Sequence, residues 1–115
     1  MIVVNERPCA QGELLVMRVV EIPASAKPMK PQGEHYVVGH SETGHHHAID
    51  RSNAEVFEAA DDKFTLWVRS LGDGAELRHL RSFDTHESLH LPPGGCYMVR
   101  RQREYVPEGF RLAAD

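Results

Sequence analysis

Short apolar segments separated by turn residues follow one another along most of the chain. From residue 35 onward a new segment begins about every ten residues, and this spacing is typical of a β-sandwich or a small β-barrel. The first segment, 14–22, is rich in Val, Leu and Met on both parities, which indicates a strand with both faces largely buried. The later strands are expected at 35–38, 45–49, 54–59, 64–71, 76–80, 88–91 and 96–106.

Glycine and proline mark the turns between these segments. Gly72-Asp73-Gly74 predicts a hairpin between 64–71 and 76–80, because glycine adopts the positive φ that tight hairpins need. A second turn is expected at 92–95, where two prolines precede two glycines. Residues 53–61 also fit a short helix capped by Ser52 or Asn53, but the strand interpretation is favoured over it.

The domain organisation follows from length and punctuation. At 115 residues, the chain 1–115 is expected to form a single domain. Three prolines within residues 23–33 restrict the backbone and predict an extended linker, and residues 107–115 are expected to be an irregular tail. The predicted fold is therefore all-β, a small antiparallel barrel or sandwich with a proline-rich connection near the N-terminus.

Charge and composition narrow the class of partner. The net charge is −4, from 17 acidic residues against 13 Lys and Arg, which argues against a general nucleic-acid binder. No apolar run approaches the length of a membrane span, and residues 1–6 lack the features of a secretory signal. Two cysteines without an export signal indicate reduced thiols and a cytoplasmic location, although one disulfide stays open. The basic cluster 100–105 could bind phosphate, but a solvated strand pairing with the acidic residues 50–62 is favoured.

Histidine is the residue type that points to chemistry. The chain has eight histidines, and three of them are consecutive at 45–47. Residues two apart on a strand lie on the same face, about 6.6 Å apart, so His45 and His47 can converge on one metal ion. Glu42 lies between two glycines just before them, and a bend there could bring its carboxylate over the same ion.

A further ligand is expected from the segment 86–90. His86 and His90 are about 13 Å apart on an extended strand, so only one of them can join His45 and His47. His86 is favoured, since His90 directly precedes the turn at residue 92 and the alternating leucines beside it face the other way. The remaining histidines, at 35, 40 and 79, are interpreted as surface or hydrogen-bonded residues.

The pattern around these histidines resembles the first motif of the cupins. A glycine, five residues and His-x-His run from Gly39 to His47, and the Pro-x-Gly at 92–94 is similar to the turn of the second motif. The resemblance implies a small antiparallel barrel that holds a divalent metal with three histidines and one glutamate. It carries over only His45 and His47 as ligands.

Other positions depart from the cupin pattern. The family's glutamate would fall at Arg51 or Ser52, and its last histidine at Tyr97. Glu42 and His86 would therefore be substitute ligands, on the geometric argument alone.

Two hypotheses for function follow. In the first, His45, His47, His86 and Glu42 bind one divalent transition metal, which could be zinc, iron, manganese or nickel, and the protein acts on a small-molecule ligand as a cupin-like metalloenzyme. In the second, the chain is a non-enzymatic binding or assembly module, a homo-oligomer or a subunit of a larger particle. Its metal would then be structural, or its histidines would form a pH-sensitive interface. The sequence leaves open which of the two holds.

Overall fold

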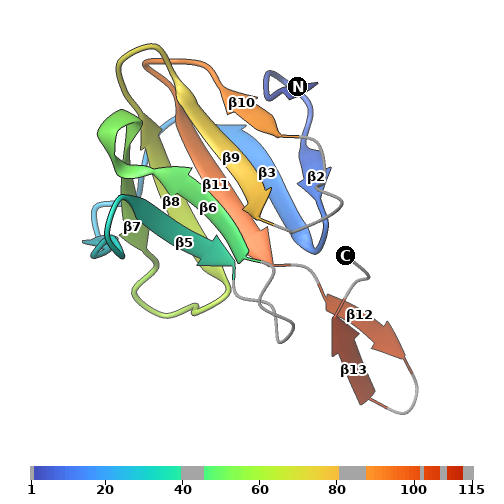
Figure 1. Ribbon diagram of the computed structural model, residues 1–115. Coiled ribbons are helices and arrows are strands. Elements are labelled where there is room, and N and C mark those ends of the chain that lie inside the picture. The colour runs from blue at the N-terminus through green and yellow to red at the C-terminus, as the bar shows by residue number, and fades with distance from the viewer. Residues whose placement is uncertain (1, 40–45, 81–87, 102, 107–108, 113–115) are drawn as a thin grey trace.

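The fold is a sandwich of two β-sheets, seen in a computed structural model that describes residues 2–39, 46–80, 88–101, 103–106 and 109–112 (Figure 1). A five-stranded sheet, called sheet A here, has the order β1-β10-β9-β6-β5, and a six-stranded sheet B has the order β2-β3-β11-β8-β7-β4. Neighbouring strands in both sheets are antiparallel, except that β1 pairs with β10 in parallel. No helix among the described residues has the length and apolar character needed to cross a membrane.

The strands have the following bounds. Sheet A contains β1 (Ile2–Val3), β5 (His35–Gly39), β6 (His46–Asp50), β9 (Ala75–Leu80) and β10 (Leu89–Leu91). Sheet B contains β2 (Cys9–Gln11), β3 (Leu14–Val19), β4 (Lys27–Pro28), β7 (Ala54–Glu58), β8 (Thr65–Ser70) and β11 (Cys96–Arg101). A short 3-10 turn, η1 (Arg51–Asn53), joins β6 to β7, and β12 (Arg103–Val106) pairs with β13 (Gly109–Leu112) in a separate two-stranded sheet.

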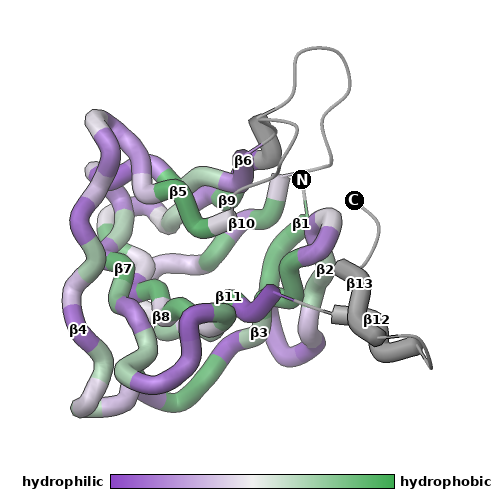
Figure 2. Tube along the Cα trace, turned by 90° about the horizontal axis from the view of Figure 1, so that it is seen from below, coloured by the Kyte–Doolittle hydropathy of each residue, from purple (hydrophilic) through white to green (hydrophobic). Residues whose placement is uncertain are grey.

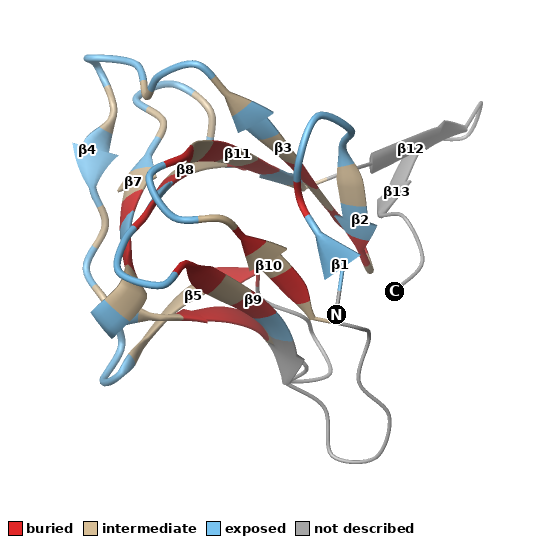
Figure 3. Ribbon diagram, turned by 90° about the horizontal axis from the view of Figure 1, so that it is seen from above, coloured by how far each residue is buried: buried red, intermediate tan, exposed pale blue. Residues whose placement is uncertain are grey.

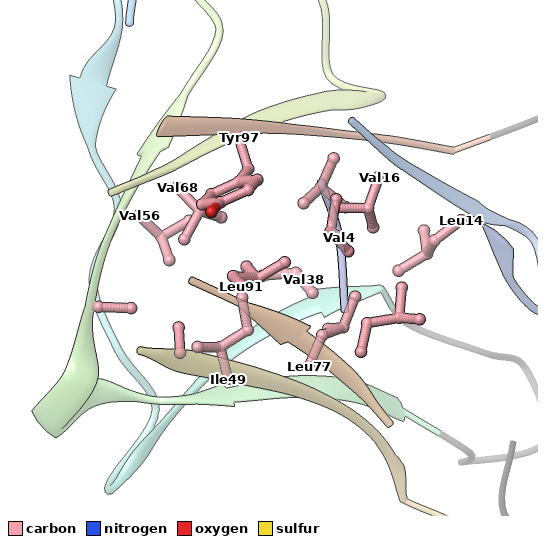
Figure 4. Packing of buried hydrophobic residues seen from close by; sticks show 14 residues of the cluster. Val4, Leu14, Val16, Val38, Ile49, Val56, Val68, Leu77, Leu91 and Tyr97 are labelled. Carbon is pink, nitrogen blue, oxygen red and sulfur yellow. The ribbon is translucent and has the colours of Figure 1, made fainter. Parts of the chain in front are cut away.

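The core lies between the two layers, which Figure 3 shows edge-on. Each sheet turns alternate side chains inward, because successive side chains of a strand point to opposite faces. On β3, for example, Leu14 and Val16 are buried, while Leu15 and Met17 are only half-buried. The inward residues of both sheets form one cluster (Figure 4), whose largest buried members are Tyr97, Leu14, Ile49, Leu77, Leu89 and Leu91.

The prediction of an all-β fold is confirmed, and so is the sandwich among its two alternatives. Sheets A and B share no strand pairing among the described strands, so these strands do not close into a barrel. Residues 54–58 form strand β7, as favoured over the helix. The expectation that residues 14–22 are buried on both faces is wrong, because the outer face of β3 has no covering layer in this two-layer fold.

The two predicted turns are present, but the hairpin at the first is wrong. Gly72 and Gly74 have positive φ, yet the turn joins β8 of sheet B to β9 of sheet A. Both edges of β8 are already occupied, by β7 and β11, so β9 cannot pair with it and crosses to the facing sheet. The turn at 92–95 likewise leads from β10 in sheet A to β11 in sheet B, with Gly94 at positive φ.

The linker and the tail also contain strands that the sequence did not predict. Within the proline-rich stretch 23–33, Lys27 and Pro28 form β4, which pairs with β7 at the edge of sheet B. An edge strand tolerates proline, because one of its sides needs no N–H donor. Within the tail expected to be irregular, 109–112 forms β13 and pairs with β12. The backbone hydrogen bonds of β4 come from β7, which is distant in sequence, and those of β13 come from the preceding strand β12.

A buried serine joins the two crossing turns. The Ser70 hydroxyl donates a hydrogen bond to the Leu91 carbonyl over 2.6 Å and accepts one from the Ala75 amide over 2.8 Å. The backbone N–H of Ser70 donates to the carbonyl of Gly95 over 3.0 Å. Nearby, the hydroxyl of buried Tyr97 donates to the Pro92 carbonyl over 2.8 Å, and desolvation by burial raises the pKa of this phenol. These contacts hold the crossings from β8 and from β10 together.

We expect Ser70→Ala to lower the free energy of unfolding by about 1–3 kcal/mol, because it leaves a buried amide and a buried carbonyl without their shared partner. Urea denaturation measures the loss. Ser25→Ala, at an exposed serine in the linker, is the matched control and should change stability by less than about 0.5 kcal/mol. Equal stability of Ser70→Ala and the control would contradict the role given to this hydroxyl.

Candidate functional site

His47 lies inside the sandwich, near one end of sheet A. Its side chain is fully buried, and Ile49, two residues further along β6, belongs to the core. His47 therefore faces the interior. Its register partners are Gly39 on β5 and His79 on β9, so it sits on a central strand between two neighbours.

A glutamine from the facing sheet orients the imidazole. The Gln11 side chain is buried, its amide Nε2 donates to the Leu77 carbonyl over 2.9 Å, and its Oε1 lies 2.9 Å from His47 Nδ1. A carbonyl can only accept, so the Leu77 contact requires Nε2 at that position and places the acceptor Oε1 against the ring. His47 Nδ1 consequently donates the hydrogen bond. In the neutral imidazole, the lone pair then resides on Nε2.

Gly39 provides the space that the His47 ring occupies. A Cβ atom at residue 39 would lie 3.0 Å from His47 Cδ2 and 3.3 Å from Leu14 Cδ1, closer than most Cβ contacts in proteins, so the ring or the leucine would have to shift. The register of β5 against β6 also shifts between Val37 and Gly39. This glycine, taken from the sequence as part of a cupin-like motif, has a direct packing role beside the histidine.

The other three predicted ligands, Glu42, His45 and His86, lie outside the described residues. The complete ligand set therefore stays a prediction. Within the described part of the chain, no group of three or more His, Cys, Asp or Glu side chains is placed to hold a metal ion.

His90, the rejected alternative to His86, is described. It lies on β10 between Leu89 and Leu91, which are fully buried in the core, so its side chain is on the outer face of sheet A. The ring packs over the turn at Gly74, where an added Cβ would lie 2.5 Å from His90 Cε1. His90 and His47 therefore occupy opposite faces of one sheet.

Two residues near His47 were missed or set aside in the sequence. Gln11 carries no motif, and only the packing of β2 across from β9 brings it to the histidine. His79 was interpreted as a surface or hydrogen-bonded residue, but the strand register places it directly opposite His47. Knowing that β6 and β9 are neighbours would have identified it, whereas the sequence separation of 32 positions gives no such signal.

A pocket of about 230 Å³ opens close to this histidine, and Gly39 is one of its lining residues. It lies between the edge strand β5 of sheet A and the ends of β7, β8 and β11 in sheet B. Its lining residues are Met29, Val37, Val38, Gly39, Glu58, Lys63, Phe64, Leu66 and Arg101.

Arg101 enters the pocket from the end of β11, where hydropathy falls from apolar to strongly hydrophilic (Figure 2). Its Nε lies 3.1 Å from Oε1 of Glu13, whose side chain is only 5% exposed. The backbone N–H of Arg101 donates to the Phe64 carbonyl over 2.9 Å. Just before Phe64, hydrogen bonds from the Thr65 hydroxyl and the Phe64 amide lower the pKa of the Asp62 carboxyl. Within the basic cluster, half-buried Arg101 thus pairs with Glu13, outside residues 50–62. The exposed Arg100 also lowers the pKa of Asp62, which agrees with the expected pairing to that acidic stretch.

The two cysteines are free thiols. Cys9 pairs with Val16 and Cys96 with Val19, on opposite sides of β3. They are therefore offset by three residues along the strands, about 10 Å, and by two strand spacings across them, which is too far for a disulfide. The disulfide that the sequence left open is excluded.

Residues 10–102 match a family described as a domain of unknown function, DUF8820. The chain belongs to this family. The match spans the strands from within β2 to β11 and includes Gln11, His47 and the pocket lining. No curated protein and no solved structure matches the chain.

We expect Gln11→Ala to destabilise the fold by about 1–3 kcal/mol, because the Leu77 carbonyl and His47 Nδ1 both lose their partner. It should also remove the preference for a proton on Nδ1, which two-dimensional ¹⁵N–¹H spectra of metal-free protein detect at His47. Gln32→Ala, at an exposed glutamine, is the control for both measurements. An Nε2-protonated ring in the unsubstituted protein would contradict the assigned hydrogen-bond direction.

Proposed function

We propose that the chain binds one divalent transition metal at the end of sheet A, with His47 Nε2 as one ligand. The carrying observation is the Gln11 contact, which holds the proton on Nδ1 and leaves the lone pair on Nε2. Metal-binding histidines characteristically donate their other ring N–H to an acceptor that fixes the tautomer and the ring orientation. A buried, hydrogen-bonded histidine can also serve stability alone, so metal analysis must separate the two roles.

The topology supports drawing the other ligands from His45, His86 and Glu42. Strand β5 ends at Gly39 and β6 begins at His46, while β9 ends at Leu80, the register partner of His46. The connections that contain residues 40–45 and 81–87 therefore leave sheet A from the same end, and His47 is one residue from that end.

The chemistry of the proposed set is mixed nitrogen and oxygen coordination. Imidazole and carboxylate ligands suit zinc, iron, manganese or nickel. A metal with an open coordination position would act as a Lewis acid or activate a water on a small-molecule ligand. A metal with four protein ligands would instead stabilise the fold.

A second candidate function, an assembly module, draws on a different feature. Strands β12 and β13 form a two-stranded sheet of their own, and such a ribbon is only marginally stable in water. A partner surface or a second copy of the chain would stabilise it. Sedimentation equilibrium of the full chain tests self-association, and a monomer at every concentration would contradict it.

The protein, purified without a nickel column, should retain near-stoichiometric divalent metal after gel filtration. We expect His45→Ala combined with His47→Ala to abolish it, as measured by inductively coupled plasma mass spectrometry. His35→Ala is the control, because His35 lies at the opposite end of β5 from Gly39, where its register partner is Asp50 on β6. Unchanged metal in the double variant would refute the site.

Protons compete for neutral imidazole, whose unperturbed pKa is about 6.5, so metal affinity should fall between about pH 7 and pH 5.

The same measurement separates the remaining histidines. We expect His86→Ala to lose most of the bound metal and His90→Ala to keep it, because His90 lies on the outer face of sheet A. His79→Ala belongs in the series, since His79 is the register partner of His47. Metal loss in His90→Ala alone would show that the ligands approach from the other face of the sheet.

A further inference from the structure

The pocket between β5 and sheet B combines an apolar interior with charged groups at its rim. Val38, Leu66 and Met29 belong to the core cluster or pack against it. Lys63 and Glu58, by contrast, are exposed. At about 230 Å³ the pocket is smaller than the roughly 300–1,000 Å³ typical of sites for drug-sized molecules. Its size and lining suit a small molecule with an apolar body and one polar end.

Among the described residues, two cations and one carboxylate line the pocket. Arg101 extends from the inward-facing parity of β11, the same as that of Val99, and Lys63 lies 5.5 Å over the Phe64 ring centroid. Glu58 has Lys27 as its register partner on β4, so a lysine beyond the lining opposes its charge. The local balance therefore favours an anionic end group over a cationic one.

Arg101 is held by a carboxylate that fixes its position. Arg101 Nε lies 3.1 Å from Glu13 Oε1, and the Glu13 side chain is only 5% exposed. The planar guanidinium is the side chain best suited to recognising a carboxylate through paired hydrogen bonds. Glu13 thus orients Arg101 and also partly neutralises its charge. Arg101 therefore favours binding of an anion, whereas the charge of Glu13 opposes it.

The third wall of the pocket is an edge strand. Val37, Val38 and Gly39 lie on β5, which among the described strands pairs with β6 alone. Alternate backbone N–H and C=O groups of an edge strand point away from its single neighbour. The backbone of this edge strand therefore lies beside the pocket that the two cationic side chains line.

We propose that this pocket binds a small organic carboxylate, with the carboxylate at Arg101 and Lys63 and the apolar body against Val38, Leu66 and Met29. The site is distinct from the proposed metal ligands. Gly39 lines the pocket and also lies beside the His47 ring, and the lining contributed by the described residues contains no histidine.

The test uses metal-free full-length protein treated with EDTA, so its result is independent of the proposed metal function. The probes are hexanoate, its neutral isostere hexanamide and the cation hexylamine. Isothermal titration calorimetry gives affinities, and ¹⁵N–¹H spectra report on the amides of Val37, Val38 and Gly39. We expect hexanoate to shift these amides and to bind at least tenfold more tightly than the other two probes.

Substitutions change the charge around the carboxylate in opposite directions. Glu13→Gln should tighten hexanoate binding about threefold to tenfold, because it removes the charge that neutralises Arg101. Glu13→Gln combined with Arg101→Gln should abolish binding without leaving a buried unpaired charge. Lys63→Gln, at an exposed residue, should weaken binding about twofold to fivefold. Arg69→Gln, at an exposed arginine paired with Glu55, should leave affinity unchanged.

Several results would overturn the proposal. Equal binding of hexanoate and hexanamide would mean that the charged end is not recognised. Tighter binding of hexylamine than of hexanoate would assign the pocket to a cation. Weaker hexanoate binding in Glu13→Gln, whose amide oxygen can still accept from Arg101 Nε, would contradict a carboxylate bound at this guanidinium. Absence of amide shifts at millimolar hexanoate would show that the pocket takes no such ligand.

Discussion

The fold depends on burying one apolar face of each sheet against the other. No single sheet of this chain could hide its side chains alone, since each has a solvated outer face and an inner face of Val, Leu, Ile and Tyr. That constraint makes the chain cross between layers after β1, β4, β6, β8 and β10. The crossings in turn need tight turns, and the buried Ser70 hydroxyl and the Tyr97 hydroxyl supply polar partners where two of those turns meet.

Polar groups inside the sandwich are few and grouped. Gln11, Glu13 and His47 lie at or near one end of the layers, and Ser70 lies at the crossing turns of the other. Burying such groups costs free energy unless each finds a partner. Ser70 has backbone partners, so its role is to stabilise the fold. The pairs Gln11–His47 and Glu13–Arg101 bring titratable or charged side chains to an end where a pocket opens, and this placement makes them the candidates for chemistry.

The proposed metal site and the proposed carboxylate pocket both border Gly39, but the two proposals rest on different observations. Gly39 touches the His47 ring through the space that a Cβ would fill, and it also lines the pocket. An organic anion in that pocket would therefore lie close to the imidazole. If both proposals hold, a small acid would bind near a divalent metal that could act on it as a Lewis acid.

The sequence by itself determined the strand content of this protein. Alternation, β-branched residues and glycine or proline punctuation are local signals, so they predicted the strands from 14 to 101 other than β4, the favoured strand at 54–59 and both turns. They did not predict the short strands β1 and β2. They also predicted that His90 faces away from its buried leucine neighbours. Only the tertiary structure decided which strands are neighbours, because pairing depends on contacts between residues far apart in the chain. It therefore turned the expected hairpin at Gly72 into a crossing, added β4 to sheet B and placed His79 opposite His47. The same long-range packing brought Gln11 to the imidazole and Glu13 to Arg101, two contacts that no local pattern encodes.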